Sequence, residues 1–239
     1  MPRTWSVSSR RFGWWVACGV AVGLAVSGRP NLAAQAPQAA GTRPDLSGIW
    51  RPASDRYATN LAADGVDVAF QPWASALFQQ RQQAERQERP SGRCRPRGVP
   101  GAMLVRAFPW KIVQTPGVVL ILFDESLHYR QIFTDGRSLP EDPTPAWFGY
   151  SVGRWEGETL VAETRGFNEE TWLDDGGHPH SDALHVIERF GRPAAGAMDV
   201  NITIDDPKAY ARPWTASVRF ERLPNVDLSE HVCAVHEIQ

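Results

Sequence analysis

The sequence has no strong excess of charge of either sign. Its 25 Lys and Arg residues stand against 27 Asp and Glu residues, so the formal net charge at pH 7 is -2. A protein without an overall positive field lacks the attraction by which nucleic-acid-binding and membrane-surface proteins hold phosphate groups. We therefore expect no nucleic-acid partner.

The sequence also lacks the short motifs that identify common enzyme classes. It has only three cysteines, and none of them has CxxC or Cys-His metal spacing. A nucleophile elbow, a phosphate-binding loop, an HExxH motif and a dinucleotide fingerprint are missing as well. No motif names a reaction, and we expect no cofactor, apart from a divalent metal that the histidines discussed below leave open.

A long apolar run occurs only near the N-terminus. Residues 1–40 combine a basic start, an apolar stretch from Phe12 to about Val26, and small residues at 33–40. This order is typical of a cleaved export signal and linker, and the apolar stretch is short for a membrane span. The sequence predicts a periplasmic or secreted protein, with no stable membrane insertion once the signal is removed.

Two cysteines remain after the predicted signal, which contains Cys18. Exported proteins mature in oxidising compartments, so Cys94 and Cys233 are predicted to form one disulfide. Two buried free thiols are the alternative.

Residues 41–239 are predicted to form a single β-rich domain. Apolar side chains at helical spacing behind Pro72 indicate one N-terminal amphipathic helix over about 71–88. From Trp110 onward, short apolar runs with period-two alternation follow one another to a last run at 227–235, separated by turn residues and without helices between them. This pattern predicts an all-β fold, a mostly antiparallel barrel or closed sandwich.

Two resemblances add to this reading. Gly48-Ile49-Trp50 resembles the Gly-x-Trp sequence that opens lipocalins, which implies a cup-shaped barrel for a small apolar ligand, although lipocalins carry their helix late in the chain. The segments YRQIFTDGR, WEGETLV, HSDALHVIERF and IDDPKAYARPW are similar to an uncharacterised family of exported bacterial proteins. The second resemblance covers about half of the chain, from Lys111 to Trp214, and implies no activity.

A long polar segment at 166–182, GFNEETWLDDGGHPHSD, is predicted to form a loop at the barrel mouth. The two-residue spacing of His178 and His180 lets both imidazoles point the same way in an extended chain, and with His185 they are candidate metal ligands. Pro179 between them argues against a metal. A metal-free polar pocket and a purely structural loop are the alternatives.

A second polar cluster lies in YRQIFTDGR. Strand alternation places Tyr129 and Gln131 on one face and Arg130 on the other. A buried arginine requires a partner, and Glu188 or Glu163 of a neighbouring strand is the candidate. Arg130 is therefore either a cavity residue that holds a substrate carboxylate or a member of a surface ion pair.

Two functions fit these features. The first is an exported small-molecule enzyme, a hydrolase, lyase or isomerase, with a polar His/Glu/Arg site at the barrel mouth. The second is a non-catalytic, lipocalin-like carrier of a small apolar ligand, in which the same residues close the mouth.

The enzyme hypothesis assigns roles to residues. Its candidate acids, bases and orienting carboxylates are His180, His185, Glu188 and Asp174. Its candidate substrate-binding residues are Arg130, Arg189, Trp172 and Tyr129. Because His185 and Glu188 lie three apart and so face opposite sides of a regular strand, their convergence requires a bulge between Ser181 and Ile187.

Overall fold

The structure, a computed structural model, describes residues 43–84 and 88–233. The predicted export signal and linker at 1–40 lie outside the described residues. The domain boundary near residue 41 therefore stays a prediction.

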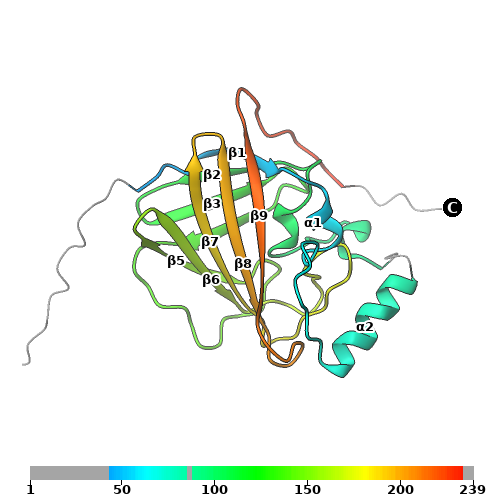
Figure 1. Cartoon of the computed structure of the whole chain (residues 1–239). Helices are drawn as coiled ribbons and strands as arrows, with labels where there is room; N and C mark the ends of the chain where they lie inside the picture. The colour runs from blue at the N-terminus through cyan, green and yellow to red at the C-terminus, as the bar shows by residue number, and fades with distance from the viewer. Residues whose placement is uncertain (1–42, 85–87, 234–239) are drawn as a thin grey trace, which may run out of the picture. The chain divides into compact units, whose positions relative to one another are not determined.

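Nine strands form a closed barrel in which each strand pairs with the next and β1 pairs with β9 (Figure 1). The strands are β1 (Gly48–Pro52), β2 (Trp110–Gln114), β3 (Val118–Phe123), β4 (Tyr129–Phe133), β5 (Tyr150–Glu156), β6 (Thr159–Arg165), β7 (His185–Ala194), β8 (Ala197–Asp205) and β9 (Trp214–Leu223). Every second side chain of β9 is buried over most of its length, which is the alternation that predicted strands. The predicted all-β barrel is confirmed.

One strand pairing in this barrel is parallel, whereas the others are antiparallel. Eight of the nine strand pairings are antiparallel, and β4 and β5 are parallel. Two consecutive strands can be parallel only if the chain crosses back between them. Residues 134–149 make that crossing.

The barrel interior is packed with apolar side chains. Trp50, Trp110, Phe190 and Phe220 are among its largest fully buried members. Both indole N–H groups are satisfied, because Trp50 Nε1 donates to Leu46 O at 2.9 Å and Trp110 Nε1 donates to a carbonyl at 3.1 Å. Since the centre of the barrel is filled, a ligand site has to lie in the wall or at an end.

Two α-helices precede β2 in the described residues, α1 (Arg56–Thr59) and α2 (Pro72–Gln83), together with the short 3₁₀ helices η1 (Pro90–Arg93) and η2 (Gly101–Met103). The predicted helix is α2, which lies outside the barrel wall (Figure 1). It is less amphipathic than predicted, because Ala74 is its only buried residue and Trp73 is 43 % exposed. No helix among the described residues is long and apolar enough to cross a membrane.

The predicted last strand at 227–235 is wrong in the part that the structure describes. Residues 224–233 form a tail outside the ladders, with an isolated bridge between Glu125 and His231. Ser126 N donates to His231 O at 3.0 Å, and Ser229 Oγ donates to Asp124 Oδ1 at 2.9 Å. Isolated hydrogen bonds therefore hold this segment, and it forms no strand ladder with the sheet.

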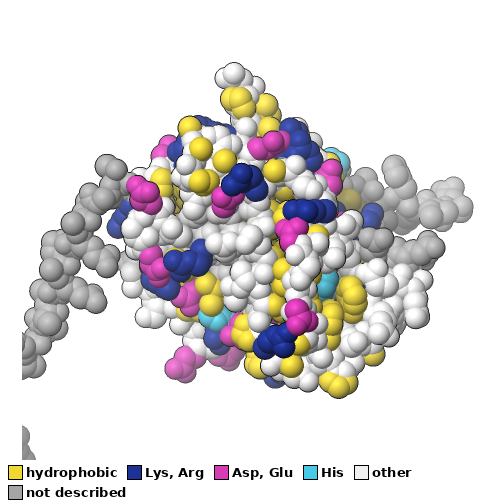
Figure 2. Space-filling view, in the orientation of Figure 1, with side chains coloured by type: hydrophobic (Ala, Val, Ile, Leu, Met, Phe, Trp, Pro, Cys, Tyr) yellow, Lys and Arg dark blue, Asp and Glu magenta, His cyan; other side chains and the backbone are white. Residues whose placement is uncertain are grey.

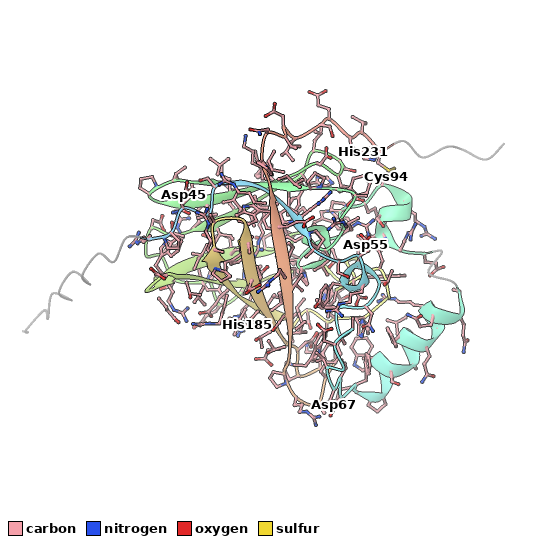
Figure 3. All side chains as sticks on the ribbon, turned by 45° about the horizontal axis from the view of Figure 1, so that its top comes forward. Asp45, Asp55, Asp67, Cys94, His185 and His231 are labelled. Atoms are coloured by element: carbon pink, nitrogen blue, oxygen red, sulfur yellow. A yellow bond between two sulfur atoms is a disulfide. The ribbon has the colours of Figure 1, made fainter. Side chains whose placement is uncertain are left out.

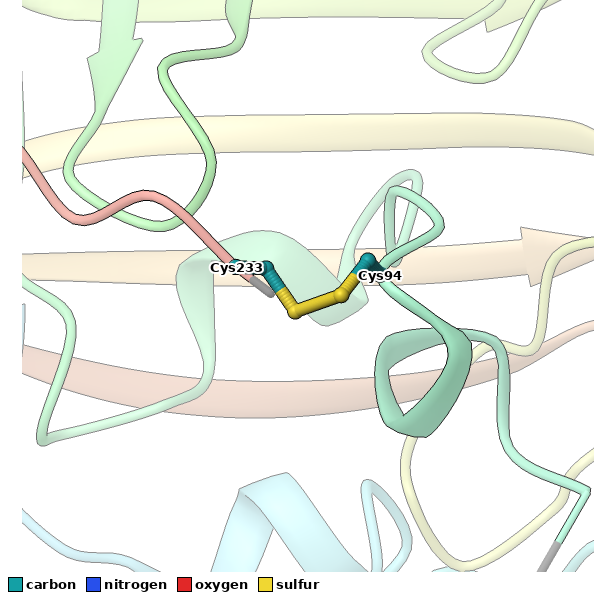
Figure 4. Close-up of a disulfide and its surroundings, with 2 residues drawn as sticks. All are labelled: Cys94 and Cys233. Atoms are coloured by element: carbon teal, nitrogen blue, oxygen red, sulfur yellow. A yellow bond between two sulfur atoms is a disulfide. The ribbon is translucent and has the colours of Figure 1, made fainter. Parts of the chain in front are cut away.

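The tail is also held covalently. Cys94 and Cys233 form a disulfide with their Cα atoms 5.5 Å apart (Figure 4), which confirms the predicted pair. The bridge joins the end of η1 to the tail across 139 positions of sequence. By fixing so long a loop, it restricts the unfolded chain more than a local bridge does.

Candidate functional site

A groove of about 570 Å³ opens in the barrel wall between β4 and β5. Arg130 and Ser151, only 2 % and 1 % exposed, line its base. A concave, mostly apolar site with a few polar groups is the usual form of a small-molecule site. Its aromatic lining residues are Tyr129, Phe133, Trp147, Phe148 and Tyr150.

The groove exists because β4 and β5 pair over only part of their length. Their parallel ladder contains two residue pairs, Ile132 with Ser151 and Phe133 with Val152. Strand β4 begins three residues before this ladder, at Tyr129. The wall is therefore open along the first half of β4.

Gly149 turns the chain away from β4 just before β5 begins. Its φ is +60°, and its N–H donates to Ala146 O at 3.2 Å. A Cβ at this position would lie 2.7 Å from Arg165 O and 2.8 Å from Thr164 Cγ2. Only glycine fits both this left-handed conformation and this close approach.

Beneath the groove, the Arg130 guanidinium binds the next three strands. Nε donates to Ser151 Oγ of β5 at 3.1 Å, Nη2 donates to Thr164 Oγ1 of β6 at 2.8 Å, and Nη1 donates to Glu188 Oε1 of β7 at 3.1 Å. A further bond from Nη2 to Glu188 Oε2 makes the ion pair bidentate. The two charges are buried together, so each depends on the other for compensation.

Part of this cluster follows the sequence prediction. Arg130 is buried, Tyr129 is 61 % exposed on the other face, and Glu188 rather than Glu163 is the partner of the arginine. The pair lies inside the barrel, so the surface ion pair considered above is wrong. Because Glu188 neutralises Arg130, the arginine does not offer a free charge to a substrate carboxylate.

The polar loop at 166–182 is folded as a packed plug. Asp174 accepts hydrogen bonds from Leu61 N at 2.7 Å and from His178 N at 3.2 Å, and its Oδ2 lies 2.7 Å from His178 Nδ1. The His178 ring is buried against Phe78, with ring centroids 4.5 Å apart. Asp174 and His178 thus fasten the loop to the segment before α2.

His180 is bonded at both ring nitrogens. Nε2 lies 2.6 Å from Thr171 Oγ1, and Nδ1 lies 3.0 Å from Ser181 O. Ser181 Oγ in turn donates to Asp206 Oδ1 at 2.7 Å. Burial lowers the pKa of His180, and neither ring nitrogen is free to exchange a proton with a substrate.

Trp172 belongs to the same plug. The Arg81 guanidinium carbon lies 4.3 Å from the centre of its ring, and the indole is buried. Trp172 was predicted to bind a substrate, but it does not line the β4–β5 groove, and its ring packs against Arg81 instead.

His185 and Glu188 lie on opposite faces of β7. The ladder of β7 with β8 runs without a shift from His185 to Gly191, so the required bulge is not formed. His185 faces outward, with Nδ1 3.2 Å from Arg165 Nη2 and Nε2 3.3 Å from Glu163 Oε2 without hydrogen-bond geometry. Figure 3 shows it well away from the labelled Cys94 and His231.

The predicted convergence of His180, His185 and Glu188 is therefore wrong. The physical reason is that burial of apolar side chains keeps β7 regular, and regular alternation separates residues three apart. Arg189 also lies on the outer face, where Nη2 donates to Glu156 Oε2 at 2.7 Å. Figure 2 shows basic and acidic side chains interspersed on the face in view.

The three histidines do not form a ligand set either. His178 contacts Asp174, His180 contacts Thr171, and His185 contacts Arg165. Within 43–84 and 88–233, no group of three or more His, Cys, Asp or Glu side chains is arranged to hold a metal ion. Each imidazole is held by a different partner. The two-residue spacing of His178 and His180 in the sequence does not contain this information.

Sequence reasoning missed His128 and the aromatic run at 147–150. His128 lines the groove, its Nε2 is buried without a hydrogen-bond partner among the described residues, and burial lowers its pKa. The available signal was the group Trp147, Phe148 and Tyr150 around a glycine, next to a proline-rich connection.

No model of a known protein family matches the chain, and no curated protein matches it. The resemblance to exported bacterial proteins therefore stays an expectation.

We expect Glu188→Gln to lower the free energy of unfolding by about 3–5 kcal/mol, because it leaves the Arg130 charge buried without compensation. The double variant Arg130→Met, Glu188→Leu should lose less than this single variant, since Ser151 Oγ and Thr164 Oγ1 still bond each other at 2.9 Å. Denaturant unfolding of wild type, Arg130→Met, Glu188→Leu and the double variant measures the double-mutant cycle, with Glu188→Gln as an additional single variant. Losses that simply add would contradict a coupled pair.

His180 should make stability depend on pH. Because burial lowers its pKa, the unfolded chain takes up the proton at a higher pH than the folded protein does. Its contribution is complete above the ordinary histidine pKa of about 6.5 and is lost as the pH falls from there through the folded-state value. His180→Gln should flatten the stability curve below that pH in denaturant titrations, whereas His231→Gln in the exposed tail is the control. Identical curves for wild type and His180→Gln would overturn this account.

Proposed function

We propose that the protein is an exported, non-catalytic carrier that binds a small, mostly apolar organic molecule in the β4–β5 groove. The observation that carries this proposal is the groove, with aromatic walls above a buried polar base. The disulfide between Cys94 and Cys233 supports the exported setting.

The charge of the lining supports an uncharged ligand. Among the lining residues, Arg130 is the only one that carries a full charge at neutral pH, and Glu188 neutralises it. His128 is neutral there, since burial lowers its pKa below the usual value. A charged ligand would lose its hydration without gaining a partner of opposite sign.

Several aromatic walls are fixed in place before a ligand arrives. Phe148 stacks on Phe123 with centroids 5.1 Å apart. Phe133 packs against Tyr150, and Arg137 Nη1 donates to the Tyr150 hydroxyl at 3.0 Å. Side chains that are already held lose little conformational freedom on binding.

An enzyme acting in the same groove, a hydrolase, lyase or isomerase, is the second candidate. The observation that favours it is the unpartnered Nε2 of His128, because a general base needs a free ring nitrogen within reach of the substrate. The acid, base and orienting roles predicted from the sequence do not apply to this groove. None of the four residues that were assigned those roles lines it: His180, His185, Glu188 and Asp174.

We expect the neutral fluorescent dye Nile red to bind in the groove and Tyr129→Ala to weaken binding about threefold to tenfold, since one aromatic contact contributes roughly 1 kcal/mol. Trp73→Ala, which removes another exposed aromatic side chain outside the groove, is the matched control. Fluorescence titration measures both. Equal affinity of the two variants, or no binding to wild type, would contradict the site.

Carrier and enzyme differ in the fate of the ligand. Small molecules extracted from the purified protein should be recovered unchanged after incubation with fresh protein, as liquid chromatography and mass spectrometry can establish. Conversion to a product that stops in His128→Gln, with Nile red binding retained, would favour the enzyme over the carrier.

A further inference from the structure

The edge of β4 that faces the groove has uncovered backbone groups. Phe123 N donates to His128 O at 2.9 Å, and Thr134 N donates to Gly117 O at 2.9 Å. In an antiparallel ladder every second residue bonds the same neighbour. The even-numbered residues of β4 therefore bond β3, and Tyr129 and Gln131 direct their N–H and C=O groups away from it.

Those groups point into the part of the wall where β5 is missing. The ladder with β5 begins at Ile132 and Ser151, and the turn at Gly149 takes the preceding chain away. In the described part of the chain, the N–H and C=O of Tyr129 and the N–H of Gln131 have no backbone partner. Unmet backbone groups of this kind are satisfied by an added strand.

We propose that this uncovered edge binds a short, uncharged peptide in extended conformation, which adds a strand inside the groove. This inference rests on the proposed function, because the peptide occupies the same site, and it narrows the ligand from an apolar molecule to an oligopeptide with apolar or aromatic side chains.

The length of the free edge sets the size of the peptide. The edge spans 129–131, about 10 Å at the rise of an extended chain, so it matches about three peptide residues. It lies in a recess of the barrel wall, between the aromatic side chains of β4 and those at 147–150.

The residues that line the groove determine which peptide side chains can fit. Successive side chains of an extended peptide point to opposite sides, so one set turns toward the base formed by Arg130 and Ser151 and the other toward the opening. The base is buried and its ion pair is closed by Glu188. Small or apolar side chains fit such a base, and a charged one would lose its hydration there.

The test uses the acetylated and amidated tripeptide Leu-Phe-Leu and the same tripeptide N-methylated on its amides. The two have the same side chains, but the second cannot donate main-chain hydrogen bonds. Isothermal titration calorimetry with the wild-type protein should show binding of the first and about tenfold weaker binding of the second, corresponding to the loss of the hydrogen bond to Tyr129 O. The Leu-Glu-Leu analogue should bind more weakly as well.

A pair of protein variants tests the same bond from the other side. Gln131→Pro removes an N–H that faces the groove and does not bond β3, whereas Gln131→Ala removes only the side chain. The proline variant should lose at least about tenfold in peptide affinity and still bind Nile red, and the alanine variant should keep both. If the proline variant does not fold, the two peptides still decide the question on wild type.

Failure of this inference is distinct from failure of the proposed function. Equal affinity for the two tripeptides, or Nile red binding without peptide binding, overturns the added strand and leaves a groove for apolar molecules. Absence of both Nile red and peptide binding overturns both proposals.

Discussion

Arg130 bonds β5, β6 and β7 at the place where the barrel wall is least paired. The chain must cross back over 134–149 to make β5 parallel to β4, and the resulting ladder has only two residue pairs. The other eight ladders are all antiparallel and contain at least three residue pairs each. One buried guanidinium with a bidentate carboxylate supplies, from inside, the cross-links that the backbone does not supply along the first half of β4.

This constraint determines where a ligand can bind and what kind it is. The barrel centre is filled by large apolar side chains, and the groove opens in the wall between β4 and β5. Because Glu188 neutralises Arg130, the base of that opening is polar without net charge. Aromatic side chains from β4 and from 147–150 complete it.

The surroundings of the groove are held by contacts that reach far along the chain. Arg97 forms ion pairs with Glu125 and with Asp175 of the plug, and these side chains are largely buried. The tail bonds Ser126 and is fixed by the disulfide of Cys94. The turn that leads into Leu127 and His128, at one end of the groove, is therefore fastened from both sides.

The sequence predicted the local features well. Period-two alternation predicted the barrel strands and placed Arg130 on the face opposite Tyr129. The cost of burying a lone charge predicted a glutamate partner for Arg130 in the case that this face is buried, which the structure shows. The cysteine pair followed from the predicted export signal. These inferences need only the spacing of residues along one strand and the oxidising compartment that an export signal implies.

Other features depend on contacts that spacing does not contain. The direction of β5 is set by how the connection at 134–149 crosses, which reads as an ordinary loop in the sequence. The histidines of the plug are fixed by distant partners: the segment before α2, through Leu61 N, holds Asp174, and Asp206 holds the residue after His180. Polar residues that are close together in the sequence therefore have different partners in the structure and do not form one site.

The central claim is that β4 has an uncovered edge above the Arg130 network. Hydrogen exchange of single amides, followed by NMR on the ligand-free protein, tests it most directly. The amides of Tyr129 and Gln131 should exchange much faster than those of Arg130 and Ile132, which bond β3. Equal protection of all four amides would mean that the wall is closed at this point and would contradict the account.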